Sequence, residues 1–193
     1  MTKKILLGGL AGSVVVFLVS GFFHMATSLG EYGIKTLPNE ESTLSALRSA
    51  IPESGLYLFP AADMSQGKSG AAQAVYLEKY RTGPVGILAY STGGMDLPFG
   101  RLLFKQFLFG LVASLLVAWV LGITASATTY ASRVLIVLLA SLFAGCLYAL
   151  PYWNWYGFPL NYTVAYIGTW CVSWAIAGLA MAAIVKPPLA ASS

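Results

Sequence analysis

Acidic residues are absent from most of this chain. All seven lie between Glu31 and Asp96, and residues 1–30 and 97–193 contain none. Charged residues make up only 9% of the chain, whereas soluble domains carry roughly 25%. A soluble fold is therefore excluded for the two flanks. A nucleic-acid surface is also excluded, because the basic residues of the flanks are scattered at the ends of apolar runs: Lys3, Lys4, Arg101, Lys105, Arg133 and Lys186.

Cysteine and histidine are equally scarce. Cys146 and Cys171 are the only cysteines, and no Cys-x-x-Cys occurs, so quinone-linked disulfide chemistry is not supported. We expect both to be small buried residues within the membrane. His24 is the only histidine, which excludes bis-histidine haem and a histidine-dominated metal site within this chain. No metal or other cofactor is identified from the sequence.

The flanks consist of long hydrophobic runs. Four of them approach the ~20 apolar residues needed to cross ~30 Å of hydrocarbon. We predict a membrane all-α fold, a four-transmembrane-helix bundle with helices at residues 5–28, 102–123, 134–150 and 162–185. Pro151, Gly157 and Pro159 would form the turn between the last two helices. We expect the first helix to be an uncleaved anchor, because its apolar core exceeds the ~7–15 residues of a signal peptide.

The basic residues predict the orientation of these helices. Lys3 and Lys4, Arg133 and Lys186 would share the cytoplasmic face, since loops on that side are enriched in Lys and Arg. Only Arg101 and Lys105, one turn apart, argue for the opposite orientation. Both termini, including the tail at 186–193, are therefore expected in the cytoplasm. The expected location is a bacterial-type inner membrane.

The acidic segment at residues 29–100 is long enough for a small extracytoplasmic α/β domain inserted between helices 1 and 2. It holds five basic against seven acidic residues, a net charge of −2, while the rest of the chain carries +6. We predict a helix at 43–51 with Ser42 as its N-cap, a strand at 55–60, a helix at 71–81 and a strand at 85–90. That order predicts a β-α-β crossover with two parallel strands. A core this small would need support from the membrane helices or from a partner.

The layout resembles that of claudin-type four-span proteins, with a large first outer segment, a short inner loop and a small second outer loop. Those proteins carry a Trp and a disulfide pair in the first outer segment. Residues 29–100 contain neither Trp nor Cys. The resemblance therefore covers the topology and implies no function.

Small residues recur at three- and four-residue spacing along the predicted helices. Such spacing places them on one helix face, where close packing supplies much of helix association in lipid. These faces would either close the bundle or form an interface with another subunit. The predicted packing residues are Gly8, Gly12, Gly110, Ser114, Ala118, Gly122, Ser141, Gly145, Ala149, Gly168, Ala175 and Gly178.

The predicted topology also brings polar and aromatic residues to one outer layer beneath the acidic domain. Tyr and Trp are expected there as an interfacial belt. The additional element is Arg101 with Lys105, a pair of cations that could hold a lipid phosphate. The candidate ligand- or lipid-binding residues are His24, Arg101, Lys105, Gln106, Trp153, Trp155, Asn161, Tyr162 and Tyr166, with Tyr148 beside them.

Two functions fit these observations. The first is a non-enzymatic membrane subunit or scaffold that packs into a larger inner-membrane complex, because no catalytic constellation is visible while packing faces are extensive. Its partners would be membrane lipids and other membrane-protein subunits, or further copies of the chain. The alternative is an outer-leaflet lipid- or quinone-binding enzyme, which implies a bound lipid or quinone near His24, Arg101 and Lys105. Ionisable residues are nearly absent from the spans, so an ion-coupled carrier is disfavoured.

Overall fold

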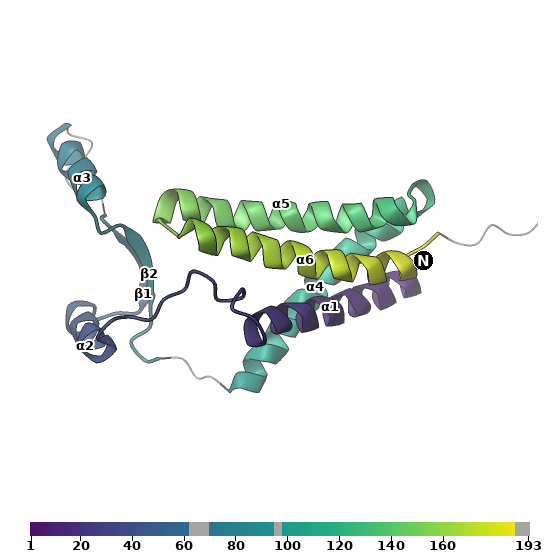
Figure 1. Cartoon of the computed structure of the whole chain (residues 1–193), viewed down its shortest axis with the longest axis horizontal. Coiled ribbons are helices and arrows are strands. Elements are labelled where there is room, and N and C mark those ends of the chain that lie inside the picture. The colour runs from purple at the N-terminus through teal and green to yellow at the C-terminus, as the bar shows by residue number, and fades with distance from the viewer. Residues whose placement is uncertain (62–69, 95–97, 188–193) are drawn as a thin grey trace, which may run out of the picture. The chain divides into compact units, whose positions relative to one another are not determined.

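The computed structural model describes residues 1–61, 70–94 and 98–187. Within them, four long helices dominate: α1 (Thr2–Met25), α4 (Phe99–Thr124), α5 (Tyr130–Tyr156) and α6 (Leu160–Ile184) (Figure 1). A 3-10 turn, η2 (Ala125–Ala127), follows α4. Each long helix is apolar and long enough to cross a membrane, so the chain fits the predicted integral membrane protein with four spans.

The chain divides into two compact units. The helical unit comprises Met1–Gly33, Leu97–Leu150 and Asn161–Ser193. The α/β unit comprises Ile34–Asp96 together with Pro151–Leu160, the tip of the α5–α6 hairpin.

In the helical unit, α1 and α4 run antiparallel and lie against each other. A Cβ added at Gly9 would come within 2.5 Å of the Leu115 side chain and 3.0 Å of its Cα. Further along the pair, the Ser13 hydroxyl donates to the Phe107 carbonyl at 3.3 Å, and Phe17 packs edge-on against the Phe107 ring. Glycine on α1 thus permits a backbone approach that a larger residue would prevent.

Another part of the α1 surface, at Gly8 and Gly12, packs against α6. A Cβ at Gly12 would lie 2.5 Å from the Met181 sulfur, and one at Gly8 would overlap the Val185 side chain. Met181 and Val185 are fully buried at these contacts. The large side chains of α6 therefore fill the space left by the small residues of α1.

The helix pair α5–α6 is also antiparallel. A Cβ at Gly178 would lie 3.1 Å from that of Val137, and the Tyr130 hydroxyl donates to the Leu179 carbonyl at 3.0 Å. All four helices contribute to one buried core: Val16, Ala118, Leu121, Val137, Trp174, Ala177, Met181 and Val185. The buried residues of α1 end at Val16 and those of α4 begin at Ser114, so this core lies toward the end where α1 begins and α6 ends.

The prediction that Pro151 forms part of the turn between the last two spans is wrong. α5 continues through Pro151 to Tyr156. Proline has no N–H to donate to the carbonyl four residues back, and the helix runs for little more than one turn beyond it. Gly157, in the left-handed region at φ 72°, ends the helix instead.

The α/β unit contains α2 (Glu40–Ala50), β1 (Gly55–Phe59), α3 (Gly70–Thr82) and β2 (Gly86–Tyr90). All four elements were expected near these positions. Ser42 is not the N-cap of α2, however, because Asn39 precedes the helix at φ 49° and Ser42 lies in its first turn. The Ser42 hydroxyl donates to the Asn39 carbonyl at 2.9 Å.

The predicted parallel pairing of the strands is wrong. β1 and β2 are antiparallel, with Phe59 opposite Gly86 and Gly55 opposite Tyr90. The connection through α3 therefore leaves and returns at the same end of the sheet (Figure 1). A crossover helix must lie across the sheet and bury one face against it. α3 buries none of its residues, so it cannot act as a crossover helix.

Candidate functional site

Four aromatic side chains come together on α5 and α6. The Tyr148 and Tyr166 rings lie 5.3 Å apart between centroids, and Tyr166 lies 6.1 Å from both Tyr162 and Trp170. Tyr162, Tyr166 and Trp170 recur every four residues and so share one face of α6. We call these four residues the aromatic cluster. Trp170 was not among the predicted site residues, although its spacing from Tyr166 places it on the same face.

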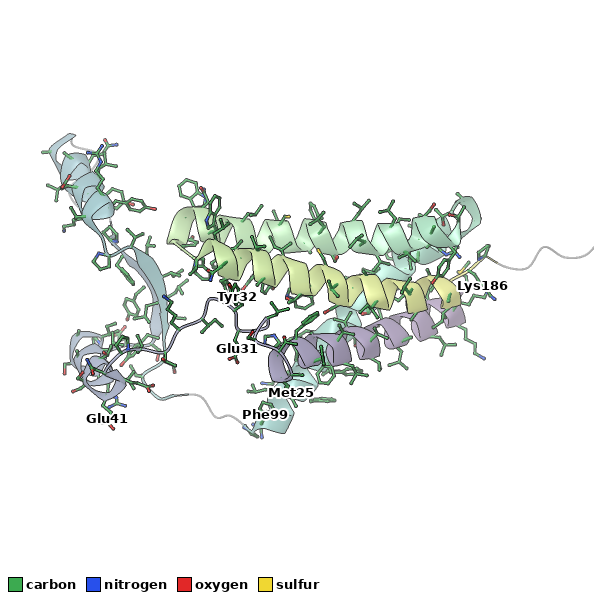
Figure 2. All side chains as sticks on the ribbon, in the orientation of Figure 1. Met25, Glu31, Tyr32, Glu41, Phe99 and Lys186 are labelled. Atoms are coloured by element: carbon green, nitrogen blue, oxygen red, sulfur yellow. The ribbon has the colours of Figure 1, made fainter. Side chains whose placement is uncertain are left out.

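The loop that follows α1 reaches this cluster. Gly33, at φ 91°, lies so close to the Tyr162 backbone that an added Cβ would be 2.8 Å from the Tyr162 Cβ. Earlier in the loop, Gly30 packs against His24 at the end of α1, and the Thr27 hydroxyl donates to the Phe23 carbonyl at 2.7 Å. Figure 2 labels Glu31 and Tyr32 on this loop. The glycines Gly30 and Gly33 were the available sequence signal for this close packing.

The other predicted site residues are more dispersed. Arg101, Lys105 and Gln106 lie on the exposed surface of the first turns of α4, and His24 and Asn161 are also exposed. Trp153 and Trp155 belong to the α/β unit, where the Trp155 carbonyl accepts a bond from the Tyr80 hydroxyl at 3.4 Å. Of the residues predicted to form one outer layer, Tyr148, Tyr162 and Tyr166 are joined by ring contacts.

The predicted small-residue faces lie mostly inside the bundle. The buried residues of these faces are Gly8, Gly12, Ser114, Ala118, Gly122, Ser141, Gly145, Ala149 and Gly178. Gly110 and Ala175 are half-buried. Gly168 is exposed, and an added Cβ would meet nothing within 4 Å, so its predicted packing role has no counterpart within this chain. α6 instead turns Ser173, Trp174 and Ala177 inward.

A second polar location lies at the end of the bundle where α1 begins and α6 ends. We call it the basic end and define it by Lys3, Lys4, Arg133 and Lys186. The Lys4 ammonium donates to the backbone carbonyls of Lys186 at 3.0 Å and Pro187 at 3.2 Å. Figure 2 labels Lys186 just beyond α6. Three of the four helices therefore bring basic residues to one end of the helical unit.

Arg133 is only 5% exposed although it carries a full charge. Its guanidinium donates to the Thr128 carbonyl at 2.7 Å and twice to the Ala182 carbonyl, at 3.3 and 3.4 Å. The carbonyls of the last helical turn have no partner within the helix and carry the negative end of its dipole. Arg133 satisfies one of them and ties the α4–α5 connection to the end of α6. The sequence indicated a boundary charge here but not its burial.

These arrangements differ in the chemistry that they can support. The aromatic cluster offers hydroxyl and indole groups beside apolar ring faces, which suit an amphipathic molecule at a membrane interface. The basic end offers ammonium donors, which suit a phosphate. Cys146 and Cys171 are free and half-buried. Among residues 1–61, 70–94 and 98–187, no group of three or more His, Cys, Asp or Glu side chains could hold a metal ion.

No protein-family model, curated protein or solved structure matches this chain.

Proposed function

We propose that this protein is a non-enzymatic subunit of a larger membrane complex, and that its α/β unit docks the partner. The observation that carries this proposal is the exposure of one sheet face. Leu56 and Leu58 alternate with Tyr57 on β1 and therefore point to the same side, where they are 69% and 47% exposed. Their partners across the sheet are Ala89 and Ile87. All four side chains on this side are aliphatic, and Ala89 is also exposed while Ile87 is half-buried.

The two helices of the α/β unit support the same conclusion. Neither α2 nor α3 buries a residue of its own. A domain of this size has a marginal core even when well packed. Contiguous exposed apolar surface usually marks an interaction site. The small-residue helix faces contribute less to the proposal than the sequence implied, because most of them are already buried within the bundle.

The docking proposal can be tested with charge on the sheet face. The double variant Leu56→Glu, Leu58→Glu places two carboxylates on that face, and Val75→Glu is a matched control on α3, where the side chain is 57% exposed. Native mass measurement after gentle extraction should show the unmodified protein with a stoichiometric partner. We expect the double variant to lose the partner and the control to keep it. A homogeneous monomer from unmodified membranes would contradict the proposal.

We further propose that the basic end faces the cytoplasm and the α/β unit the outside of an inner membrane. Support comes from Lys4, Arg133 and Lys186, which gather at one end of the bundle, as the positive-inside rule expects for cytoplasmic loops. In a variant without native cysteines, a cysteine at Ser49 of α2 should react with an impermeant thiol reagent in intact cells. One at Ser126 should react only after lysis. The reverse labelling pattern would contradict this orientation.

The aromatic cluster favours a second candidate function, the binding of a lipid or quinone headgroup in the outer leaflet. Its rings join two spans, and Tyr148 is exposed while Tyr162, Tyr166 and Trp170 are half-buried. Tyr166→Leu removes the central ring of the cluster. Loss of co-purifying lipid or quinone in this variant, with retention in Trp119→Leu at an exposed position of α4, would favour this function over docking.

A further inference from the structure

The basic end carries more positive charge than the protein around it neutralises. The segments that meet there are the first turn of α1, the α4–α5 connection and the residues after α6. None of them contains an acidic residue, because every Asp and Glu of the chain lies between positions 31 and 96. Four cationic side chains therefore lie at one end of the bundle, with no acidic side chain among the described residues there.

The four cations are not equivalent. Arg133 is buried, and its guanidinium is engaged by the Thr128 and Ala182 carbonyls, so it is a structural residue. Lys4 is half-buried and directs its ammonium to two backbone carbonyls, which leaves one of its three protons to donate. Lys3 and Lys186 are exposed. The carbonyl bond from Lys4 places an ammonium of α1 directly beside the backbone of Lys186.

We propose that Lys3, Lys4 and Lys186 bind the phosphate of an anionic phospholipid at the end of the bundle where α1 begins and α6 ends. The site lies at the ends of membrane-spanning helices, where a phospholipid headgroup is the nearest anion. The apolar residues of α1 beside it, Leu6, Leu7 and Leu10, are exposed and suit an acyl chain. This site is distinct from that of Arg101 and Lys105, which lie in the first turns of α4. It does not depend on the docking function.

The test uses the full-length protein in detergent, to which phosphatidylglycerol or phosphatidylcholine is added before native mass measurement. We expect retained phosphatidylglycerol and little phosphatidylcholine. Each lysine near an anionic headgroup contributes about fivefold to binding, so Lys3→Gln, Lys4→Gln and Lys186→Gln together should weaken retention on the order of 100-fold. The matched control is Lys79→Gln with Arg81→Gln, which removes two exposed cations from α3 and should leave retention unchanged.

Two further variants keep the proposal falsifiable if the loss of Lys4 disturbs the helix contact. Lys3→Gln with Lys186→Gln preserves the Lys4 bonds and should still weaken retention about 25-fold. Replacement of all three lysines by arginine keeps the charge and should retain the lipid. Equal retention of the two lipids, unchanged binding in the glutamine variants, or an equal loss in the Lys79 and Arg81 control would overturn the proposal. Displacement of the lipid by millimolar inorganic phosphate would assign the site to a soluble anion and overturn it as well.

Discussion

In the helical unit, Gly12 of α1 lets Met181 of α6 lie against the helix backbone, whereas in the α/β unit neither α2 nor α3 buries any residue. Both units are rich in apolar side chains. They differ in whether small residues on one element face large residues on another. The comparison shows that close backbone approach stabilises the bundle in lipid, while apolar composition alone does not give the α/β unit a core.

The largest effect is expected from overpacking the α1–α6 contact. Gly12→Leu places a branched side chain where an added Cβ already lies 2.5 Å from the Met181 sulfur, so we expect a loss of about 3 kcal/mol in the free energy of unfolding. Gly168→Leu is the matched control, because nothing lies within 4 Å of its added Cβ, and it should change stability by less than about 0.5 kcal/mol. Denaturation by SDS in mixed micelles measures both. Equal losses would contradict the packing account, because helix propensity favours leucine over glycine at both positions.

A smaller loss is expected when the buried cation is removed. Arg133→Met leaves the Ala182 and Thr128 carbonyls without their charged donor and should cost about 2 kcal/mol. Lys3→Met removes an exposed cation of the same end and should have an effect near zero. The same unfolding measurement applies. If Arg133→Met were as stable as the unmodified protein, water or lipid would have to satisfy those carbonyls.

Replacement of one buried serine of the bundle is expected to raise its stability rather than lower it. Among the buried side chains that the structure describes, the Ser114 hydroxyl is the polar group that has no hydrogen-bond partner. Ser114→Ala should therefore stabilise the bundle by about 1 kcal/mol. Ser173→Ala is the comparison, since that hydroxyl donates to the Thr169 carbonyl at 2.8 Å and its removal should be slightly destabilising. Thermal unfolding in detergent would resolve the difference in sign, and a destabilised Ser114→Ala would refute it.

The smallest effect is expected in the α/β unit. Leu77→Gln replaces a large apolar residue that is 50% exposed on α3, a helix with no buried residue. We expect a change below about 0.5 kcal/mol, because little surface returns to water. Hydrogen exchange in β1 and β2 reports on this unit directly. Markedly faster exchange in the variant would mean that α3 supports the sheet, and the contrast between the two units would weaken.

The sequence predicted the helices of the bundle better than it predicted their faces. On α4, the predicted packing residues Ser114, Ala118 and Gly122 are buried, whereas the fourth, Gly110, is half-buried. On α6, small residues occur on more than one side, so the exposed Gly168 could not be distinguished from the buried Ser173. A lipid-facing side is as apolar as a protein-facing side. The contrast that reveals the inner face of a soluble helix is therefore missing.

The remaining differences have similar physical causes. Local signals gave the elements of the α/β unit but not the strand pairing, which depends on whether α3 packs across the sheet. Charge placed Arg133 at a membrane boundary, but its burial depends on the free carbonyl of Ala182 at the end of another helix. Of the candidate site, the aromatic spacing on α6 could be read from the sequence. Gly33 signalled that a close approach was possible, but Tyr162 could not be identified as its partner, because the two segments lie far apart in the chain.

The contact of Gly8 and Gly12 with Val185 and Met181 also constrains the order of assembly. During synthesis α1 enters the bilayer first, and α4 can pair with it as soon as it follows. Gly8 and Gly12 have no Val185 and Met181 to pack against until α6, the last helix, is made. A pair of α1 and α4 formed earlier is therefore incomplete, and α6 closes the bundle.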